Sequence, residues 1–123
     1  MVPGRWTVGH CTLADGEVQT GVTALLPHQG DIFHDKVMAA SHVINGFGKT
    51  TGLVQIDELG TLETPILFTN TLSVGTVETA LVKYMLDKNP TSARLPAAST
   101  RWSASATTAA STTSGASTSQ KKT

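Results

Sequence analysis

The stretch TPILFTNTLSVGTVETALVKYMLDKNP, residues 64–90, carries the clearest structural signal in this chain of 123 residues. Ser73 precedes its periodic part and is expected to cap a helix, and Pro90 stops that helix just after Asn89. Between these positions, apolar residues recur at intervals of three, four and four, which predicts one buried helical face. The residues on that face are Val74, Val77, Leu81 and Met85.

Short apolar runs bounded by turn formers precede the helix and predict strands. The segments HQGD, NGFG and DELG supply the turns, because glycine, asparagine and aspartate favour them. Strands followed by a helix indicate a mixed α/β layered fold. The apolar runs are TGVTALLP (20–27), KVMAASHVI (36–44), GLVQI (52–56) and TPILFT (64–69).

The composition divides the chain into two parts, residues 1–90 and 91–123. The first part holds five basic and nine acidic residues, and the second holds four basic residues and no acidic one. Serine, threonine and alanine fill 24 of the last 33 positions, which leaves too little apolar surface to offset chain entropy. We therefore expect one folded domain at 1–90 and a disordered tail at 91–123. Four dispersed cations with one aromatic residue do not predict a nucleic-acid partner.

Several other classes are disfavoured by what the sequence lacks. Cys11 is the single cysteine, so an internal disulfide is excluded. No run of 18 apolar residues predicts a membrane span, and the first 30 residues show no secretory signal. A cytoplasmic protein is the expectation.

The segment NGFGKTTG, residues 45–52, contains half of a phosphate-binding motif. The full signature G-x-x-x-x-G-K-[ST] requires glycine at position 43, which is Val43 here. Its mechanism also requires a helix after the loop, whereas Leu53, Val54 and Ile56 favour a strand. A nucleotide site is therefore not expected.

Two clusters of chemically capable residues have structural interpretations. The segment PHQGDIFHD places four possible metal ligands within eight residues, but a solvated loop explains the same letters, and we expect no metal. His10 and Cys11 are adjacent on an expected strand, where their side chains point to opposite faces and cannot form a catalytic pair. The possible ligands are His28, Asp31, His34 and Asp35.

Other titratable and nucleophilic residues are also assigned to structure. His42 lies between apolar residues and is expected in the core or at an interface. Asp57, Glu58 and Glu63 lie in turn-like sequence and are expected to be solvated. Ser41 lacks a preceding glycine and is not expected to be a nucleophile, and the same holds for the helix-capping serine.

The chain resembles the L-aminopeptidase/D-esterase family, which includes the beta-peptidyl aminopeptidases. The resemblance covers nearly all of residues 2–90. It rests on the segments VPGRWTVGHCTL, TGVTALLPH, HVINGFGKTTGLVQIDELGTLETPILFTNTLSVGTVETALVKYML and DKNP.

The resemblance implies an N-terminal-nucleophile-type serine peptidase with an αββα two-sheet sandwich, of which residues 1–90 form the incomplete first part. The family's precursor cleaves itself before a serine, whose hydroxyl then serves as nucleophile. Its catalytic residues lie beyond residue 90, so no catalytic residue is assigned here. The resemblance implies no cofactor, a peptide or aminoacyl amide or ester substrate for the full-length protein, and a homo-oligomer for the intact enzyme.

Four residues in the most family-typical loops are candidates for the lining of a substrate pocket: Asn45, Phe47, Asn70 and Thr71. The alternative is that they only shape turns, as asparagine and glycine often do.

The resemblance continues past residue 98 only in a displaced reading frame. After its NP dipeptide the family reads approximately VNPVVGECNDGYLNDIRG. Residues 99–116, STRWSASATTAASTTSGA, admit a coding string whose frame displaced by one base encodes VNPVVGECNDGCLNDIRG. The single difference is a cysteine at the codon overlapping Ala110, where the family has tyrosine. We therefore expect residues 91–123 to be family DNA translated out of frame.

Three functions compete. The first is an N-terminal fragment of an aminopeptidase that is inactive on its own. The second is a non-catalytic binding or structural domain that retains part of the fold, and the third is a small nucleotide-binding protein.

Overall fold

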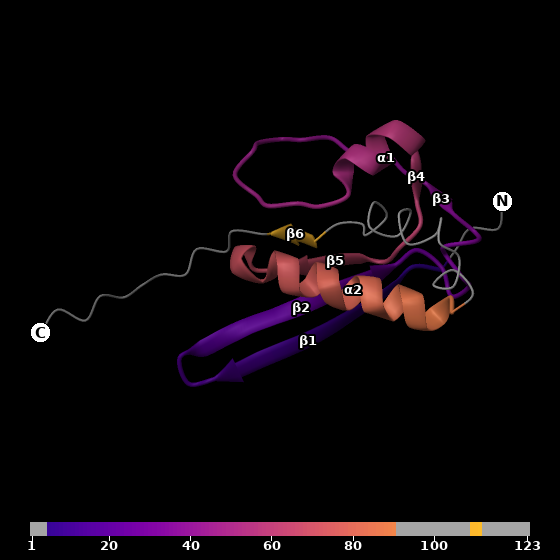
Figure 1. Cartoon of the computed structure of the whole chain (residues 1–123). Coiled ribbons are helices and arrows are strands. Elements are labelled where there is room, and N and C mark those ends of the chain that lie inside the picture. The colour runs from indigo at the N-terminus through magenta and orange to yellow at the C-terminus, as the bar shows by residue number, and fades with distance from the viewer. Residues whose placement is uncertain (1–4, 91–108, 112–123) are drawn as a thin grey trace, which may run out of the picture.

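The computed structural model describes residues 5–90 and 109–111, and their main feature is a sheet of order β1-β2-β5-β6 (Figure 1). β1 (Thr7–Asp15) and β2 (Val18–Leu26) form an antiparallel hairpin. The two strands are joined by a two-residue turn, in which Gly16 has a φ of 58°, a region that favours glycine. β5 (Ile66–Thr69) pairs antiparallel with β2, and β6 (Ala109–Ser111) pairs parallel with β5.

A smaller part of the fold holds a second sheet and a short helix. β3 (Val37–Met38) pairs antiparallel with β4 (Thr61–Leu62), and α1 (Leu53–Leu59) lies between them in sequence. Figure 1 shows a long loop before α1 that extends away from the four-stranded sheet.

The helix α2 (Val74–Lys88) confirms the predicted periodicity, since its buried residues are Val74, Val77, Leu81 and Met85. The first two pack against Val22 of β2 and Leu67 of β5. The last two join a core with Ile32, Ile56 and Leu62. One helix therefore ties the hairpin sheet to the smaller part of the fold.

The prediction of a strand at GLVQI is wrong, because α1 occupies it. A strand would place Val54 and Ile56 on the same face, yet Val54 is 84% exposed and Ile56 only 6%. Glycine marks both ends of α1: Gly52 and Gly60 have φ angles of 79° and 65°, and Gly60 N donates to Ile56 O at 2.7 Å. Burial of one face overrides the strand preference of these residues. The predicted strand over residues 36–44 shortens to β3.

Ser73 occupies the N-cap position of α2, but its side chain makes no capping hydrogen bond. A short 3₁₀ helix, η1 (Thr71–Ser73), precedes α2 and is capped by Asn70, whose Oδ1 accepts from Ser73 N at 3.0 Å. The capping role predicted for Ser73 therefore belongs to Asn70, one turn earlier.

Part of the segment expected to be disordered is a strand. Residues 109–111 form β6 beside β5, with Phe68 opposite Ala110. The rest of 91–123 lies outside the described residues, and disorder there stays a prediction. Across the described part of the chain, no helix has the length and apolar character needed to cross a bilayer.

Candidate functional site

A polar cavity of about 370 Å³ lies where β2 begins and β5 ends. Its walls come from both strands of the hairpin and from the turn into η1. Among the described residues that line it, threonine hydroxyls and side-chain amides dominate, and none of their side chains is ionisable. The lining residues are Thr12, Gln19, Thr20, Gly21, Thr23, Phe68, Thr69 and Asn70.

Hydrogen bonds hold the polar groups of this cavity in place. Asn70 Nδ2 donates to Thr20 Oγ1 at 2.9 Å, which ties the end of β5 to the start of β2. At its border, His10 Nδ1 and Thr23 Oγ1 lie 2.9 Å apart on neighbouring strands. A Cβ on Gly21 would lie 2.8 Å from the carbonyl oxygen of Cys11, so this glycine permits the close approach of β1. Neutral donors and acceptors of this kind recognise amide groups.

The structure brings only part of the predicted lining set together. Asn70 lines the polar cavity, and Thr71 follows it as the first residue of η1. Asn45 and Phe47 do not line it. They belong to the loop before α1, where Asn45 Oδ1 accepts from Phe47 N at 3.1 Å and the Phe47 side chain is 85% exposed. Their geometry fits the turn-shaping alternative.

Sequence reasoning missed the threonines of the hairpin. Thr12 lies opposite Gly21, and Thr23 lies two positions farther along β2 on the same face. The sequence signal that could have identified them is the alternation of polar residues over 10–12 and 19–23. It becomes readable only once the register of β1 and β2 is known, because a shift of one residue moves every side chain to the other face.

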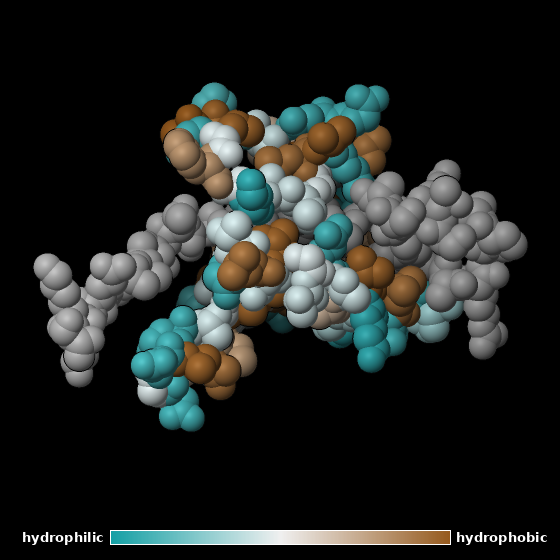
Figure 2. Space-filling view, turned by 60° about the vertical axis from the view of Figure 1, so that its left-hand side comes forward, coloured by the Kyte–Doolittle hydropathy of each residue, from teal (hydrophilic) through white to brown (hydrophobic). Residues whose placement is uncertain are grey.

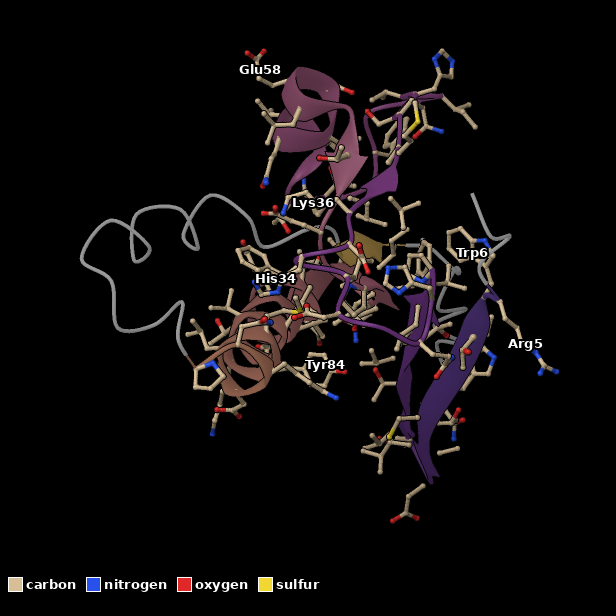
Figure 3. The ribbon with its side chains drawn as sticks, turned by 90° about the vertical axis from the view of Figure 1, so that its right-hand side faces the viewer. Arg5, Trp6, His34, Lys36, Glu58 and Tyr84 are labelled. Carbon is tan, nitrogen blue, oxygen red and sulfur yellow. The ribbon has the colours of Figure 1, made fainter. Side chains whose placement is uncertain are left out.

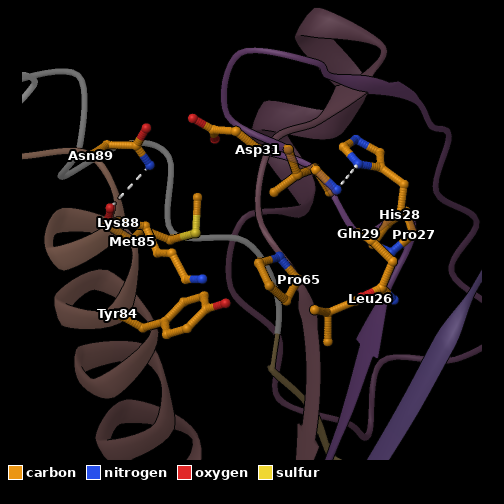
Figure 4. Close-up of a pocket in the computed structure, with 12 residues that line it drawn as sticks. Leu26, Pro27, His28, Gln29, Asp31, Pro65, Tyr84, Met85, Lys88 and Asn89 are labelled. Atoms are coloured by element: carbon orange, nitrogen blue, oxygen red, sulfur yellow. Dashed lines mark hydrogen bonds between the residues drawn. The ribbon is translucent and has the colours of Figure 1, made fainter.

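A second cavity, here called the loop–helix cavity, also measures about 370 Å³. It lies between the loop after β2 and the last turns of α2 (Figure 4). His28 shapes that loop: its Nδ1 accepts from Gly30 N at 3.0 Å, and its Nε2 donates to Asp35 O at 2.8 Å. These two bonds require the tautomer with hydrogen on Nε2.

Asp31 and His34 form an exposed pair in the same loop. Asp31 Oδ2 lies 2.6 Å from His34 Nδ1, and Asp31 Oδ1 accepts from Phe33 N at 3.0 Å. The hydrogen bond with His34, followed by that from Phe33 N, lowers the pKa of Asp31 below its usual value. Within residues 5–90 and 109–111, no group of three or more side chains is arranged to hold a metal ion.

Glu63 corrects the expectation of a solvated carboxylate. Its side chain is buried, and its Oε2 lies 3.2 Å from Lys36 Nζ while its Oε1 accepts from Gln55 Nε2 at 2.9 Å. Figure 3 shows Lys36 between α1 and the loop that carries His34. Burial is possible because a cation and an amide satisfy the carboxylate. A sequence reading of DELGTLETP cannot show which partners would reach this position.

The remaining titratable residues follow a simpler pattern. Asp57 and Glu58 are exposed as expected, although they lie on α1 rather than in a turn. His42 is exposed in this chain, so of its two expected places the core is wrong, and a place at an interface stays a prediction. It precedes the exposed Val43 and Ile44, and apolar neighbours in sequence therefore did not indicate a core.

Two hydroxyl groups of the described residues lie beside a potential base. Thr23 is next to His10, and Ser41 Oγ donates to Asp57 Oδ1 at 2.5 Å. Cys11 is exposed and follows His10 on β1, so the two side chains point to opposite faces. The segment GKTTG does lead into a helix, contrary to expectation, but α1 has only seven residues, and the strand before the loop, β3, already ends at Met38.

Comparison with known proteins identifies the family. The profile of peptidase family S58 matches residues 2–112. The beta-peptidyl aminopeptidase of Sphingosinicella microcystinivorans is 38% identical over 89 residues, which are 65% of this chain and 22% of the relative. That of Sphingosinicella xenopeptidilytica is 36% identical over 95 residues, which are 70% of this chain and 23% of the relative.

Solved structures agree with this relationship. A protein of Pyrococcus horikoshii OT3 matches 71% of this chain and 27% of its own, at 48% identity and a TM-score of 0.69. A Burkholderia sp. beta-aminopeptidase matches 72% of this chain and 29% of its own, at 42% identity and a TM-score of 0.64. The L-aminopeptidase D-Ala-esterase/amidase of Ochrobactrum anthropi matches 74% and 27%, at 30% identity and a TM-score of 0.65.

The chain therefore spans less than a third of the length of each of these relatives. The Ochrobactrum anthropi enzyme is described as a serine aminopeptidase and a variant of the Ntn hydrolase fold. The fold of the described residues is correspondingly mixed α/β, with antiparallel pairing in both sheets and two α-helices. With a family profile that covers most of its length, this chain belongs to peptidase family S58.

Proposed function

We propose that this chain is the N-terminal part of an S58 aminopeptidase, a serine hydrolase that releases N-terminal residues from peptides, amides or esters. In this proposal residues 1–90 supply the first part of a two-sheet sandwich and one wall of the substrate site. The match to aminopeptidases over 22–29% of their length supports it. The chain on its own is inactive.

One observation supports the proposal: two residues that line the polar cavity pair with β6, the strand that contains Ala110. Phe68 and Thr69 line the cavity and pair with residues 110 and 111 of β6. The codon overlapping Ala110 is the one whose displaced frame falls on the family's tyrosine. If the restored chain keeps this pairing, the tyrosine would lie beside the polar cavity, and we propose that the cavity binds amide groups of the substrate.

The described residues supply a wall of hydrogen-bonding groups but no complete catalytic set. Acyl transfer needs a nucleophile, a base oriented by a third group and a preorganised oxyanion site. The pair of His10 and Thr23 is exposed, and within the described part of the chain no third group is hydrogen-bonded to it. Loss of triad-type groups from a comparable enzyme costs on the order of 10⁶ in rate. The purified 123-residue chain is therefore expected to leave an aminoacyl nitroanilide unhydrolysed.

The test restores the frame by one base near codon 90 with the downstream gene intact. The product is expected to be a longer precursor that cleaves itself into two subunits and releases N-terminal residues from small amides. Turnover is expected to be weak with cysteine at the codon overlapping Ala110 and to recover with tyrosine, whose hydroxyl donates more strongly than a thiol. Turnover by the purified 123-residue chain, in proportion to its concentration, would contradict the fragment proposal.

A pair of threonine variants in the restored precursor tests the role of the polar cavity. Thr23→Val keeps the side-chain shape and removes one lining hydroxyl, so KM for an aminoacyl amide should rise about fivefold to tenfold with kcat unchanged, the worth of one hydrogen bond. Thr79→Val is the matched control, because Thr79 Oγ1 donates only within α2, to Gly75 O at 2.9 Å. Equal effects of the two variants would count against the cavity as a substrate site.

The alternative is a binding or structural domain that keeps the same cavity without catalysis. It predicts that the restored frame gives no self-cleavage and no activity, while the fold is retained. A homo-oligomeric state of the intact enzyme, which the family resemblance implies, and a cytoplasmic location remain parts of the proposal.

A further inference from the structure

The loop–helix cavity lies at the opposite end of the sheet from the polar cavity. β2 runs from Gln19, at the polar cavity, to Leu26, at the loop–helix cavity. β5 is antiparallel to β2, so Pro65 at its start lies beside Leu26 and Asn70 at its end lies beside Thr20. A ligand in the loop–helix cavity is therefore separate from the proposed substrate site.

Opposite charges come to this cavity from two different elements. Asp31 contributes a carboxylate from the loop after β2, and Lys88 contributes an ammonium group from the last turn of α2. Figure 4 shows the two charged groups well apart around the cavity, with the Lys88 side chain alongside the Tyr84 ring. Lys88 Nζ lies 5.5 Å from the centre of that ring, which favours this position of the cation.

The neighbours of both charged groups fix their positions and leave them ionised. Asp31 accepts from Phe33 N and pairs with His34, and this bonding lowers its pKa, so the carboxylate is ionised at neutral pH. Each carboxylate oxygen has a further lone pair for a ligand donor. The ammonium group of Lys88 carries three hydrogen-bond donors. Its contact with the Tyr84 ring face is not a hydrogen bond to a lone pair, so it occupies none of these donors.

Apolar side chains form part of the wall of this cavity, which also includes the polar side chains of His28, Gln29 and Asn89. Met85 is 2% exposed and Ile32 is 6% exposed, so both side chains are fixed in the core. Pro65 and Leu26 also belong to the apolar part of the wall. At about 370 Å³ the cavity lies near the lower end of the range of about 300–1,000 Å³ typical of small-molecule sites.

We propose that the loop–helix cavity binds a free amino acid with an apolar side chain. The ligand's ammonium group would bind Asp31, its carboxylate would bind Lys88, and its side chain would contact Met85 and Pro65. A single cation is too little for a phosphorylated ligand, which carries about two negative charges per monoester group. The proposal does not rest on the proposed aminopeptidase function.

Equilibrium dialysis of the full 123-residue chain against radiolabelled L-leucine tests this site and needs no catalytic readout. Saturable binding is expected. L-Leucinamide lacks the carboxylate and N-acetyl-L-leucine lacks the ammonium group, so each should compete at least tenfold less well, a loss typical of an unpaired charged partner. No saturable binding would overturn the proposal, and equal competition by N-acetyl-L-leucine would reduce the site to a simple anion site.

Charge variants assign the two ends of the ligand. Lys88→Gln should weaken the binding of L-leucine and N-acetyl-L-leucine about tenfold and leave the binding of L-leucinamide unchanged. Asp31→Asn should weaken the binding of L-leucine and L-leucinamide and leave that of N-acetyl-L-leucine unchanged. Lys83→Gln is the control, since Lys83 lies on α2 but does not line the cavity. If Asp31→Asn disturbs the loop, as circular dichroism would report, the Lys88 series decides alone. Unchanged L-leucine binding in Lys88→Gln would overturn the assignment.

Discussion

At the scale of single residues, the most consequential group is the buried carboxylate of Glu63. It joins Lys36, which precedes β3, to Gln55 of α1 through contacts of 3.2 and 2.9 Å. The Glu63 side chain is 6% exposed and that of Lys36 is 37% exposed. The two partners are therefore not equivalent, because only Lys36 can turn to water when the pair is broken.

This asymmetry predicts unequal costs of substitution. Lys36→Met leaves a buried carboxylate without its cation and should lower the free energy of unfolding by about 1–3 kcal/mol. Glu63→Gln keeps a similar shape and an acceptor for Gln55 and should cost less. In the Glu63→Gln background, Lys36→Met should cost less than in the original chain. Urea denaturation of the four proteins measures this cycle, and equal costs in both backgrounds would show that the pair is not coupled.

The pair of Asp31 and His34 predicts a dependence of stability on pH. The pKa of Asp31 is lowered in the folded chain by the hydrogen bond with His34, so its contribution is complete above the unfolded value of about 3.9. It is lost as the pH falls through the folded pKa. Because the pair is exposed, the contribution is expected to be under about 1 kcal/mol.

Urea titrations of the original chain and Asp31→Asn from pH 7 to pH 2 check this expectation. The difference in unfolding free energy should be constant at neutral pH and shrink only below about pH 4. Asp35→Asn is the control, because it removes a neighbouring carboxylate that is not hydrogen-bonded to any of the described residues, although the Asp35 backbone is. A difference that grows on acidification would have the wrong sign for a lowered pKa.

At the scale of elements, the entry into α2 depends on Asn70 rather than Ser73. Asn70→Ala removes the acceptor for Ser73 N and the donor to Thr20, and should cost about 1 kcal/mol, as for other N-caps. Ser73→Ala should be nearly neutral, because the serine side chain makes no capping bond. Thermal unfolding of both variants tests the assignment. A larger loss for Ser73→Ala would restore the serine as the functional cap.

The predictable elements were those with a long periodic signal. α2 has four buried residues within a span of twelve, and a proline directly follows its C-cap, so both the helix and its end could be predicted from the sequence. α1 spans only seven residues, and a short run with β-branched residues is equally typical of a strand. Only its position between the core and solvent selects the helix, and that information is not local.

The polar cavity shows the same limit for function. Asn70 was identified because it lies in a family-typical loop, whereas Thr12 and Thr23 depend on the register of a hairpin. The loop–helix cavity joins residues 26–32 to residues 84–89, and no sequence motif connects these segments. Cavities formed by distant segments become visible only when the packing is known.

At the scale of the whole molecule, a large share of the apolar surface is uncovered. Figure 2 shows hydrophobic residues reaching the surface in several separate regions. Ile44, Phe47 and Val54 are 90%, 85% and 84% exposed, and they belong to α1 and the loop before it. Every residue of the outer strand β1 is exposed as well. An unpaired strand edge and exposed apolar side chains both favour association.

The isolated chain is therefore expected to associate as its concentration rises. Sedimentation velocity should show a weight-average mass that increases over the micromolar range, because burying apolar surface gains about 25 cal/mol per Å². Ile44→Ser combined with Phe47→Ser removes two of the most exposed apolar side chains and should move this association to severalfold higher concentration. Thr50→Ser, a polar change in the same loop, serves as the control. A chain that stays monomeric and melts in one sharp cooperative transition would show that its core is closed. The exposed apolar side chains of the loop before α1 would then not mark a surface that another part of the protein covers.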